Sequence, residues 1–597
     1  MPATEQLLSD PELLGSGWDL EPIVGGEGPA GVERLLDEAL SRGARFAQAY
    51  TGRVAALDSG GLREAMLELA AIGELADRAG SYAMLAFATD TADPARGALL
   101  QRVQERGTEL ETQLLFFELE WAALDDPAAE AMLSGGAELA FCAHHLRSAR
   151  RYRPHLLSEP EERVLAEKSL ASSASWARLF GEQVAAIRVT IDGGERPLEA
   201  ALSDLQSPDR DLRRRSAEAI SAALEPGLRT RAFIYNTLVY DKSVDDRLRR
   251  YPHWLAARNL ANEAPDESVL ALIHAVRGRY DIPQRWYRLK ARLLGLDRLS
   301  DYDRNATIAS SEPLFSYAQA RELVTDTYAR FSPQAGEIAR RFFDEHWIDA
   351  PLRDNKRPGA FCATVYGVHP YVLLNFTAKR RDVMTVAHEL GHGLHAVLAA
   401  GQGVFHQSTP LTVAETASVF GETLVFERLL AESGSGEERL DLLAGRIDDS
   451  VATVFRQIAM NRFEHLVHTR RRSQGELSID DISAAWVESQ GEMLGDAVEI
   501  TDGYRSWWSY IPHFINTPGY VYAYAYGQLL ALSVYGRYRE TGEALVPRYL
   551  EMLAAGGSLP PERLGEIVGV DLGDPGFWDA GLALVDEQLS QAEQLAG

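Results

Sequence analysis

Apolar and polar positions along the chain alternate mainly at helical spacing. Apolar residues recur three and four positions apart in long stretches, as they do on the buried face of an amphipathic helix. Short groups of glycine, proline or aspartate separate these stretches. The clearest cover residues 32–40, 61–79, 97–124 and 161–180. This pattern predicts a mostly α-helical protein.

Two short stretches have the pattern of strands. Residues 187–191 alternate with a period of two and run into Asp192-Gly193-Gly194, which predicts a tight hairpin at a domain junction. Residues 371–376 form an apolar run after His369-Pro370. We expect this second strand to be a sheet edge that pairs with an extended peptide, with an interior core strand as the alternative.

Length and composition describe a large globular protein. With 597 residues the chain exceeds the size of one hydrophobic core, so we expect at least two substructures. No apolar run approaches the roughly 18 residues that span a bilayer. The first residues lack the basic and apolar segments of a signal peptide, which favours a cytoplasmic location. Cys142 and Cys362 are the only cysteines, so histidine and carboxylate must hold any metal.

The charge of the chain limits its partners. The formal net charge is −27, from 60 lysines and arginines against 87 aspartates and glutamates. Phosphate backbones and anionic membranes need a positive surface, so neither nucleic acid nor a membrane is an expected partner. The acidity could favour cationic or neutral peptides, but solubility alone explains it equally well.

The motif His388-Glu389-Leu390-Gly391-His392 indicates a metal-dependent hydrolase. Residues four apart lie on one face of a helix, so both imidazoles can bind one ion at about 2 Å. Glu389 lies next to them on the helix, where it can reach a water on that ion and act as general base. Asp382 precedes the motif and either supports a ligand or caps the helix.

The third ligand must come from elsewhere in the chain. A third histidine six residues after His392 is absent, because that position is Leu398. His395 follows along the same helix and cannot converge easily on the same ion, so we interpret it as a supporting or packing residue. Glu415 is the preferred ligand and Glu422 the next choice. The neighbours of Glu415 are small enough for close helix approach: Ala414, Ala417 and Ser418.

A divalent zinc ion held by two neutral imidazoles and one carboxylate keeps a net positive charge, which allows a bound water to ionise near neutral pH. Glu389 would take the proton and deliver it to the departing amine. The ligand types do not exclude manganese or cobalt.

A tyrosine-rich segment follows His513, between residues 519 and 527. In a helix, Tyr520 and Tyr524 would share one face and Tyr522 and Tyr526 another, so at most one pair can point toward the ion. Tyrosines often pack in the core, and the spacing alone does not decide between packing and donation to an oxyanion.

In these motifs the chain resembles the oligoendopeptidase F group of the thimet oligopeptidase family of zinc metallopeptidases. The resemblance spans nearly the whole length. Besides the motif at His388, it rests on Trp18-Asp19-Leu20, Glu167-Lys168-Ser169, residues 176–180, residues 241–248, Gly359-Ala360-Phe361, His369-Pro370-Tyr371, residues 414–418, Ile511-Pro512-His513-Phe514 and residues 554–558.

The resemblance implies a mostly helical enzyme whose two halves flank a deep substrate channel. A small β-sheet would lie beside the zinc helix in a zincin-like catalytic core, and the channel would admit only short, unstructured peptides. Residues 1–200 correspond to the N-terminal helical oligoendopeptidase F-type domain and residues 201–597 to the catalytic domain.

By position, the resemblance makes His388, His392 and Glu415 the ligands of one zinc ion and Glu389 the base. It places His513 near the oxyanion and matches Tyr520 and Tyr524 to the tyrosine pair of the family. The spacing from His513 to Tyr520 is longer than in the mammalian branch, and residue 527 is glycine where that branch has tyrosine.

The expected activity is therefore endopeptidase cleavage of short peptides. A zinc carboxypeptidase-like exopeptidase and a peptide-binding scaffold without turnover are the alternatives. Side-chain preference and oligomeric state do not follow from the sequence.

Overall fold

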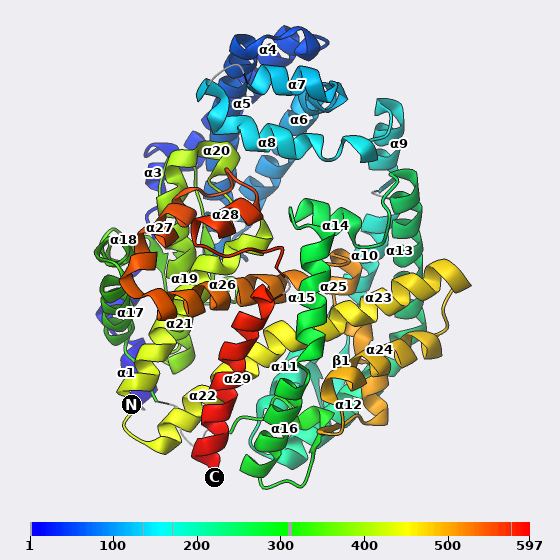
Figure 1. Cartoon of the computed structure of the whole chain (residues 1–597), viewed down its shortest axis with the longest axis vertical. Helices are drawn as coiled ribbons and strands as arrows, with labels where there is room; N and C mark the ends of the chain where they lie inside the picture. Colours follow the sequence, from blue (N-terminus) through cyan, green and yellow to red (C-terminus); the bar gives the residue numbers. More distant parts are fainter. Residues whose placement is uncertain (1–2, 135–136, 170, 309–312, 575) are drawn as a thin grey trace. The chain divides into compact units, whose positions relative to one another are not determined.

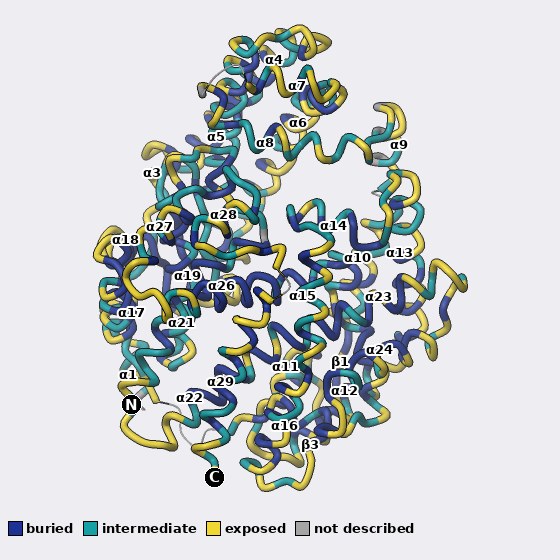
Figure 2. Tube along the Cα trace, in the orientation of Figure 1, coloured by how far each residue is buried: buried dark blue, intermediate teal, exposed yellow. Residues whose placement is uncertain are grey.

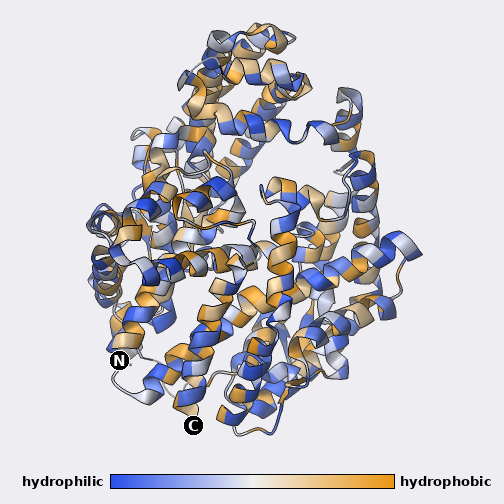
Figure 3. Cartoon of the chain, in the orientation of Figure 1, coloured by the Kyte–Doolittle hydropathy of each residue, from blue (hydrophilic) through white to orange (hydrophobic). Residues whose placement is uncertain are grey.

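The computed structural model describes residues 3–134, 137–169, 171–308, 313–574 and 576–597. Helices form most of these residues, and the strands form small sheets of two or three members (Figure 1). The prediction of a mostly α-helical protein is therefore confirmed. Figure 3 shows the amphipathic pattern directly, because hydrophilic and hydrophobic residues alternate around most helices. No helix in the described residues is long and apolar enough to cross a membrane.

Contacts within the chain define two compact units, and each is built from three separate stretches. The first comprises Met1–Arg153, Ser311–Leu429 and Arg537–Asp571, and the second Pro154–Ser310, Leu430–Gly536 and Leu572–Gly597. The domain boundary near residue 200 and the substrate channel stay predictions.

Three long helices of the first unit correspond to the first three predicted stretches. They are α4 (Gly28–Tyr50), α5 (Ser59–Thr89) and α6 (Pro94–Ala123), which pack against one another. Along α4 the buried residues Val32, Leu35, Leu36 and Ala39 follow the helical repeat, and Figure 2 shows buried and exposed positions alternating there.

The second unit contains the predicted hairpin. Strands β1 (Arg188–Ile191) and β2 (Gly194–Pro197) pair antiparallel, and the turn residues Asp192 and Gly193 have φ angles of 52° and 82°. The helix predicted over residues 161–180 is instead two helices, α9 (Glu159–Ser169) and α10 (Ser173–Ala185), because residues 171–172 form a turn.

The core of the second unit is rich in aromatic side chains. It lies among α12 (Arg210–Leu224), α13 (Leu228–Leu248), α23 (Arg456–Gln474) and α24 (Ile479–Leu494). Phe514 packs there against Phe463, with ring centroids 4.9 Å apart. This contact anchors the short helix α25 (His513–Asn516), whose first residue is His513.

A three-stranded sheet lies beside the predicted metal-binding helix in the first unit, as the resemblance implied. Its order is β4-β6-β5, with β4 at Ile348–Asp349, β5 at Phe361–Ala363 and β6 at Tyr371–Leu373. Strand β6 is parallel to β4 and antiparallel to β5. The prediction that residues 371–376 form a sheet edge is wrong, since β6 is the central strand and is fully buried. The edge beside the helix is β5.

The predicted metal-binding helix is α19 (Arg380–Leu398). It contacts β5, β6, α17 (Tyr317–Phe331), α18 (Pro333–Asp344) and α27 (Val546–Ala554). Its buried apolar face includes Val383, Val386 and Leu390. At the start of the helix, Asp382 Oδ2 accepts the backbone N–H groups of Thr377 and Lys379, each at 2.8 Å. Of the two interpretations of Asp382, the helix cap is therefore the confirmed one.

Candidate metal centre

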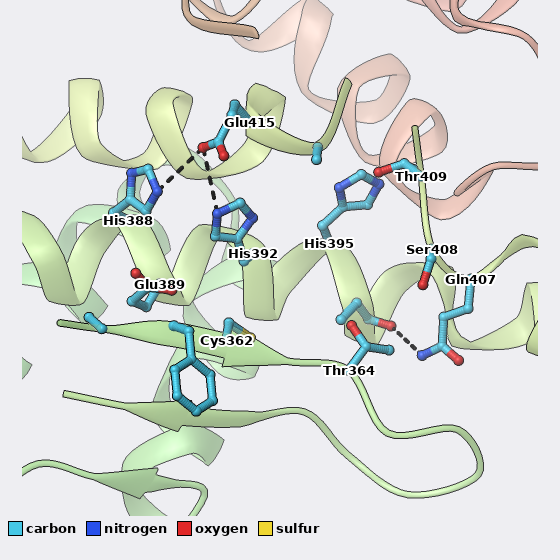
Figure 4. A pocket seen from close by; sticks show the side chains of 14 residues that line it. Cys362, Thr364, His388, Glu389, His392, His395, Gln407, Ser408, Thr409 and Glu415 are labelled. Atoms are coloured by element: carbon cyan, nitrogen blue, oxygen red, sulfur yellow. Dashed lines mark hydrogen bonds and ion pairs between the residues drawn. The ribbon is translucent and has the colours of Figure 1, made fainter. Parts of the chain in front are cut away.

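The side chains of His388, His392 and Glu415 meet at one point in the first unit. The two histidines lie one helical turn apart on α19, and Glu415 projects from the first turns of α21 (Leu411–Glu432), as Figure 4 shows. Glu415 Oε2 is 3.3 Å from His388 Nε2 and 3.6 Å from His392 Nε2. One potential ligand atom from each residue lies within 4.8 Å of the other two. The structure thus brings together the three residues that the sequence predicts as metal ligands.

The donor set and its spacing fit a tetrahedral zinc ion. Ligand atoms bound at about 2.0–2.1 Å in tetrahedral geometry are separated by about 3.3 Å, and both carboxylate-to-imidazole distances are close to that value. Two imidazoles and a carboxylate are also a ligand combination that hydrolytic zinc sites use.

Glu422 contacts the opposite side of the His388 ring. Its Oε2 lies 3.2 Å from His388 Nδ1, whereas Nε2 of the same ring faces Glu415. A carboxylate that accepts the Nδ1 proton fixes the tautomer in which Nε2 is available to a metal, and it makes that nitrogen a stronger ligand. The geometry therefore favours an orienting role for Glu422, which was the next choice for third ligand, over direct coordination.

Glu389 lies next to the cluster and faces the sheet. Its side chain points toward β5 in Figure 4, and its carboxylate accepts a hydrogen bond from the backbone N–H of Cys362. The residue is 6% exposed. This contact ties the carboxylate to the edge strand, beside the ligands but not among them.

Burial and neighbouring charges shift the pKa values of four side chains in the centre. Burial opposes a charge on His388, yet Glu415 and Glu422 raise the pKa of that ring to about 10. Burial lowers the pKa of His392 to about 4 and raises the pKa of Glu389 to about 7. Burial alone would raise the pKa of Glu415, but the two neighbouring histidines have the larger effect and lower that pKa to about 2. Glu415 is therefore ionised near pH 7 and stabilises a positive charge beside it, here the proton on His388.

Close approach of α19 and α21 makes the cluster possible. Gly391, inside the motif, lies against the backbone of α21, and an added Cβ would be 2.4 Å from the carbonyl oxygen of Ala417 and 2.6 Å from Cα of Ser418. The small residues around Glu415 thus permit the close helix approach that the sequence predicted.

We expect Gly391→Ala to separate the two helices. The added methyl group has no space, so overpacking should lower the free energy of unfolding by about 1–3 kcal/mol, and displacement of Glu415 should weaken metal binding. Urea unfolding and metal titration measure the two effects. Gly401→Ala is the matched control because its Cβ would meet no atom within 4 Å. Equal stability of the two variants would contradict this account.

His513, Tyr520 and Tyr524 form a cluster of their own in the second unit. His513 Nε2 is 3.2 Å from the Tyr524 hydroxyl, and the Tyr520 and Tyr524 rings pack edge to face with centroids 5.1 Å apart. All three are half-buried. Their proposed roles at the oxyanion stay predictions.

The other two tyrosines of the segment are core residues. Both are fully buried. The Tyr522 hydroxyl accepts a hydrogen bond from Asn262 Nδ2 at 3.0 Å, and the Tyr526 hydroxyl is 3.2 Å from Ser268 Oγ. The tyrosines of α26 (Tyr522–Thr541) and the preceding turn thus divide into two faces, as the spacing predicted.

Sequence reasoning missed part of the surroundings of the cluster. A pocket beside it is also lined by residues of β5, of the segment that follows it and of the loop before α21: Phe361, Cys362, Thr364, Gln407, Ser408 and Thr409. In the sequence, only the segment at residues 359–361 pointed to any of these residues, because it is one of the motifs on which the resemblance rests. A three-residue strand and an irregular loop have no periodicity that could identify them.

A helical fold with two histidines and a carboxylate converging beside a buried glutamate is typical of metal-dependent hydrolases. The family model of peptidase family M3 matches residues 204–584, and the model described as Oligopeptidase F matches residues 120–188. The chain belongs to peptidase family M3, and the resemblance drawn from its motifs is confirmed.

Individual relatives cover most of the chain. Oligopeptidase PepF of Bacillus subtilis is 26% identical over 559 residues, which are 92% of this chain and 82% of the relative. Group B oligopeptidase PepB of Streptococcus agalactiae is 27% identical over 491 residues, 80% of this chain and 81% of the relative.

Solved structures share the fold. A crystal structure from Chlamydophila abortus aligns with a TM-score of 0.86 at 23% identity and covers 99% of both chains. Oligoendopeptidase-F from Enterococcus faecium aligns with a TM-score of 0.71 at 21% identity, covering 94% of this chain and 98% of its own.

Proposed function

We propose that this peptidase is a zinc-dependent endopeptidase that hydrolyses short oligopeptides. The observation that carries the proposal is the convergence of His388, His392 and Glu415 at metal-ligand spacing beside the buried Glu389. The substrate class follows the names of the relatives, which are called oligopeptidases or oligoendopeptidases.

His388, His392 and Glu415 would hold one zinc ion, and Glu422 would orient the His388 ring. A bound zinc ion polarises a carbonyl group and lowers the pKa of water. Mixed nitrogen and oxygen ligands accept other divalent ions as well, so availability contributes to which metal is bound.

Glu389 is the proposed general base. Its carboxylate takes a proton from the attacking water and delivers that proton to the amide nitrogen as the peptide bond breaks. The hydrogen bond from the Cys362 N–H holds the carboxylate in place, and burial raises its pKa to about 7, which makes it a stronger base than an exposed glutamate.

Strand β5 is the proposed binding edge for the substrate main chain. It pairs with β6 on one side only in the sheet order β4-β6-β5, and it lies directly beside α19. An extended peptide can add to such an edge by main-chain hydrogen bonds, which bind without regard to side chains.

His513, Tyr520 and Tyr524 are retained as proposed donors to the negative charge that develops on the carbonyl oxygen. Hydroxyl and imidazole N–H groups are suitable donors, and preorganised donors of this kind contribute strongly to catalysis. The contacts among the three side chains support them as one group.

Digestion of a peptide blocked at both ends tests the proposal. We expect cleavage at an internal bond, loss of cleavage with a chelator, and recovery on addition of one equivalent of zinc, with products identified by mass spectrometry. Release of terminal residues only, from unblocked peptides, would favour the exopeptidase alternative. Stoichiometric peptide binding without products would favour the scaffold.

A further inference from the structure

The pocket at the metal centre continues beyond the ligands along α19. Its volume is about 430 Å³, enough for a side chain in addition to the reacting amide. Figure 4 shows its far end, where side chains of α19, of the segment just after β5 and of the loop before α21 come together. The residues that line this end are Thr364, His395, Gln407, Ser408 and Thr409.

His395 is a buried polar side chain that lines this end of the pocket. It follows His392 by one helical turn and is 8% exposed. In the part of the chain that the structure describes, its imidazole makes no hydrogen bond. Buried polar groups are normally hydrogen-bonded, and an exception that faces a cavity points to a partner that binds there.

The surrounding groups are polar and carry no formal charge. Burial lowers the pKa of His395 to about 4, so the ring is neutral near pH 7. Gln407 Nε2 donates to the carbonyl oxygen of Ala396 at 3.0 Å, which fixes the carboxamide. Ser408 Oγ lies 3.1 Å from the Tyr366 hydroxyl.

This lining discriminates between classes of side chain. A charged group would find no counter-ion among these side chains, and it would lose part of its hydration beside the buried His395 and Gln407. An apolar group would leave the buried imidazole without a partner, which costs more than a hydrogen bond contributes on average. An uncharged side chain with donors and acceptors avoids both penalties.

We propose that this end of the pocket is a specificity subsite for an uncharged, hydrogen-bonding side chain of the peptide, and that His395 is its specificity-determining residue. The inference rests on the proposed peptidase function. Three residues of helix advance by about 4.5 Å, and an extended peptide advances by about 3.3 Å per residue. The side chain in the subsite therefore belongs to a residue one or two positions from the cleaved bond.

Nearly isosteric peptide pairs test the subsite. Asparagine is compared with leucine, and threonine with valine, at each of the two positions on both sides of the cleaved bond. For the wild type we expect kcat/KM to favour the polar member by about tenfold or more at one position. The ratio of kcat/KM for the polar member to kcat/KM for the apolar member should fall to near one in His395→Leu. It should be partly retained in His395→Gln, because glutamine can still form hydrogen bonds.

The control variant is His274→Leu, an exposed histidine of α15 (Asp266–Gly278), which should keep the wild-type ratio. Metal content is measured for every variant. If His395→Leu loses metal, Thr409→Val is used in its place. This substitution changes the same end of the pocket but lies outside α19, and it should lower the kcat/KM ratio of the polar to the apolar peptide.

Equal rates for both members of every pair in the wild type would overturn the subsite. An unchanged ratio in His395→Leu with full metal content would overturn the role of His395. Failure of the wild type to cleave any peptide, or cleavage that a chelator does not affect, would instead contradict the proposed function.

Discussion

Replacing Glu389 with glutamine is expected to lower kcat by about 10²–10⁴-fold, with little change in KM, on a peptide that is cleaved internally. Glutamine has nearly the same volume and its side-chain oxygen can still accept the N–H of Cys362, so the buried contact with β5 is kept. An amide oxygen cannot take a proton from water. The loss should therefore fall on the chemical step, and initial rates over a range of peptide concentrations measure it.

Two comparisons make the Glu389 result specific. Metal content and thermal stability should match the wild type, because Glu389 is not among the three converging side chains that we propose as ligands. Glu551→Gln, on the exposed side of α27, should keep full activity. A Glu389→Gln protein that is fully metal-loaded and still cleaves at the wild-type rate would remove Glu389 from the role of base.

The helix that carries the proposed ligands was predictable because its geometry is local. Helical spacing alone puts His388 and His392 on one face, and the apolar residues between and before them indicate which face is buried. The small residues around Glu415 also carried usable information, since close helix packing requires them. The contact of Gly391 with the α21 backbone is the physical basis of that signal.

The position of β6 in its sheet could not be predicted from its own residues. A central strand and an edge strand differ in how many neighbours they pair with. The neighbour that makes β6 central is β4, a pair of residues at Ile348–Asp349 with no strand periodicity. An apolar run of six residues fits both positions.

The different roles that we propose for Glu415 and Glu422 also depend on tertiary structure. Glu415 and Glu422 are seven residues apart, so helical periodicity places both on the face toward α19. Periodicity does not say that one carboxylate reaches Nε2 of His388 and the other Nδ1. That His395 has no hydrogen-bond partner among the residues that the structure describes is likewise a property of the assembled pocket, which forms from three separated segments.

Replacing Glu415 with glutamine is expected to weaken zinc binding by more than about 100-fold. The neutral amide is a poor ligand, and the two remaining imidazoles cannot complete the site. Glu422→Gln should cost less, about 10–100-fold, because Glu422 acts through the orientation of His388 and not as a ligand. Competition with a chromophoric chelator at fixed pH gives the affinity of each protein.

Thermal unfolding gives an independent measure of the same difference. Zinc at a free concentration 100 times the wild-type dissociation constant should stabilise the wild type by about 2.7 kcal/mol, and the Glu415→Gln protein by less than about 0.5 kcal/mol. Without zinc the comparison isolates the direct cost of the substitution. If Glu422→Gln abolished binding while Glu415→Gln kept wild-type affinity, the roles of the two carboxylates would be exchanged, and the metal would lie on the Nδ1 side of His388.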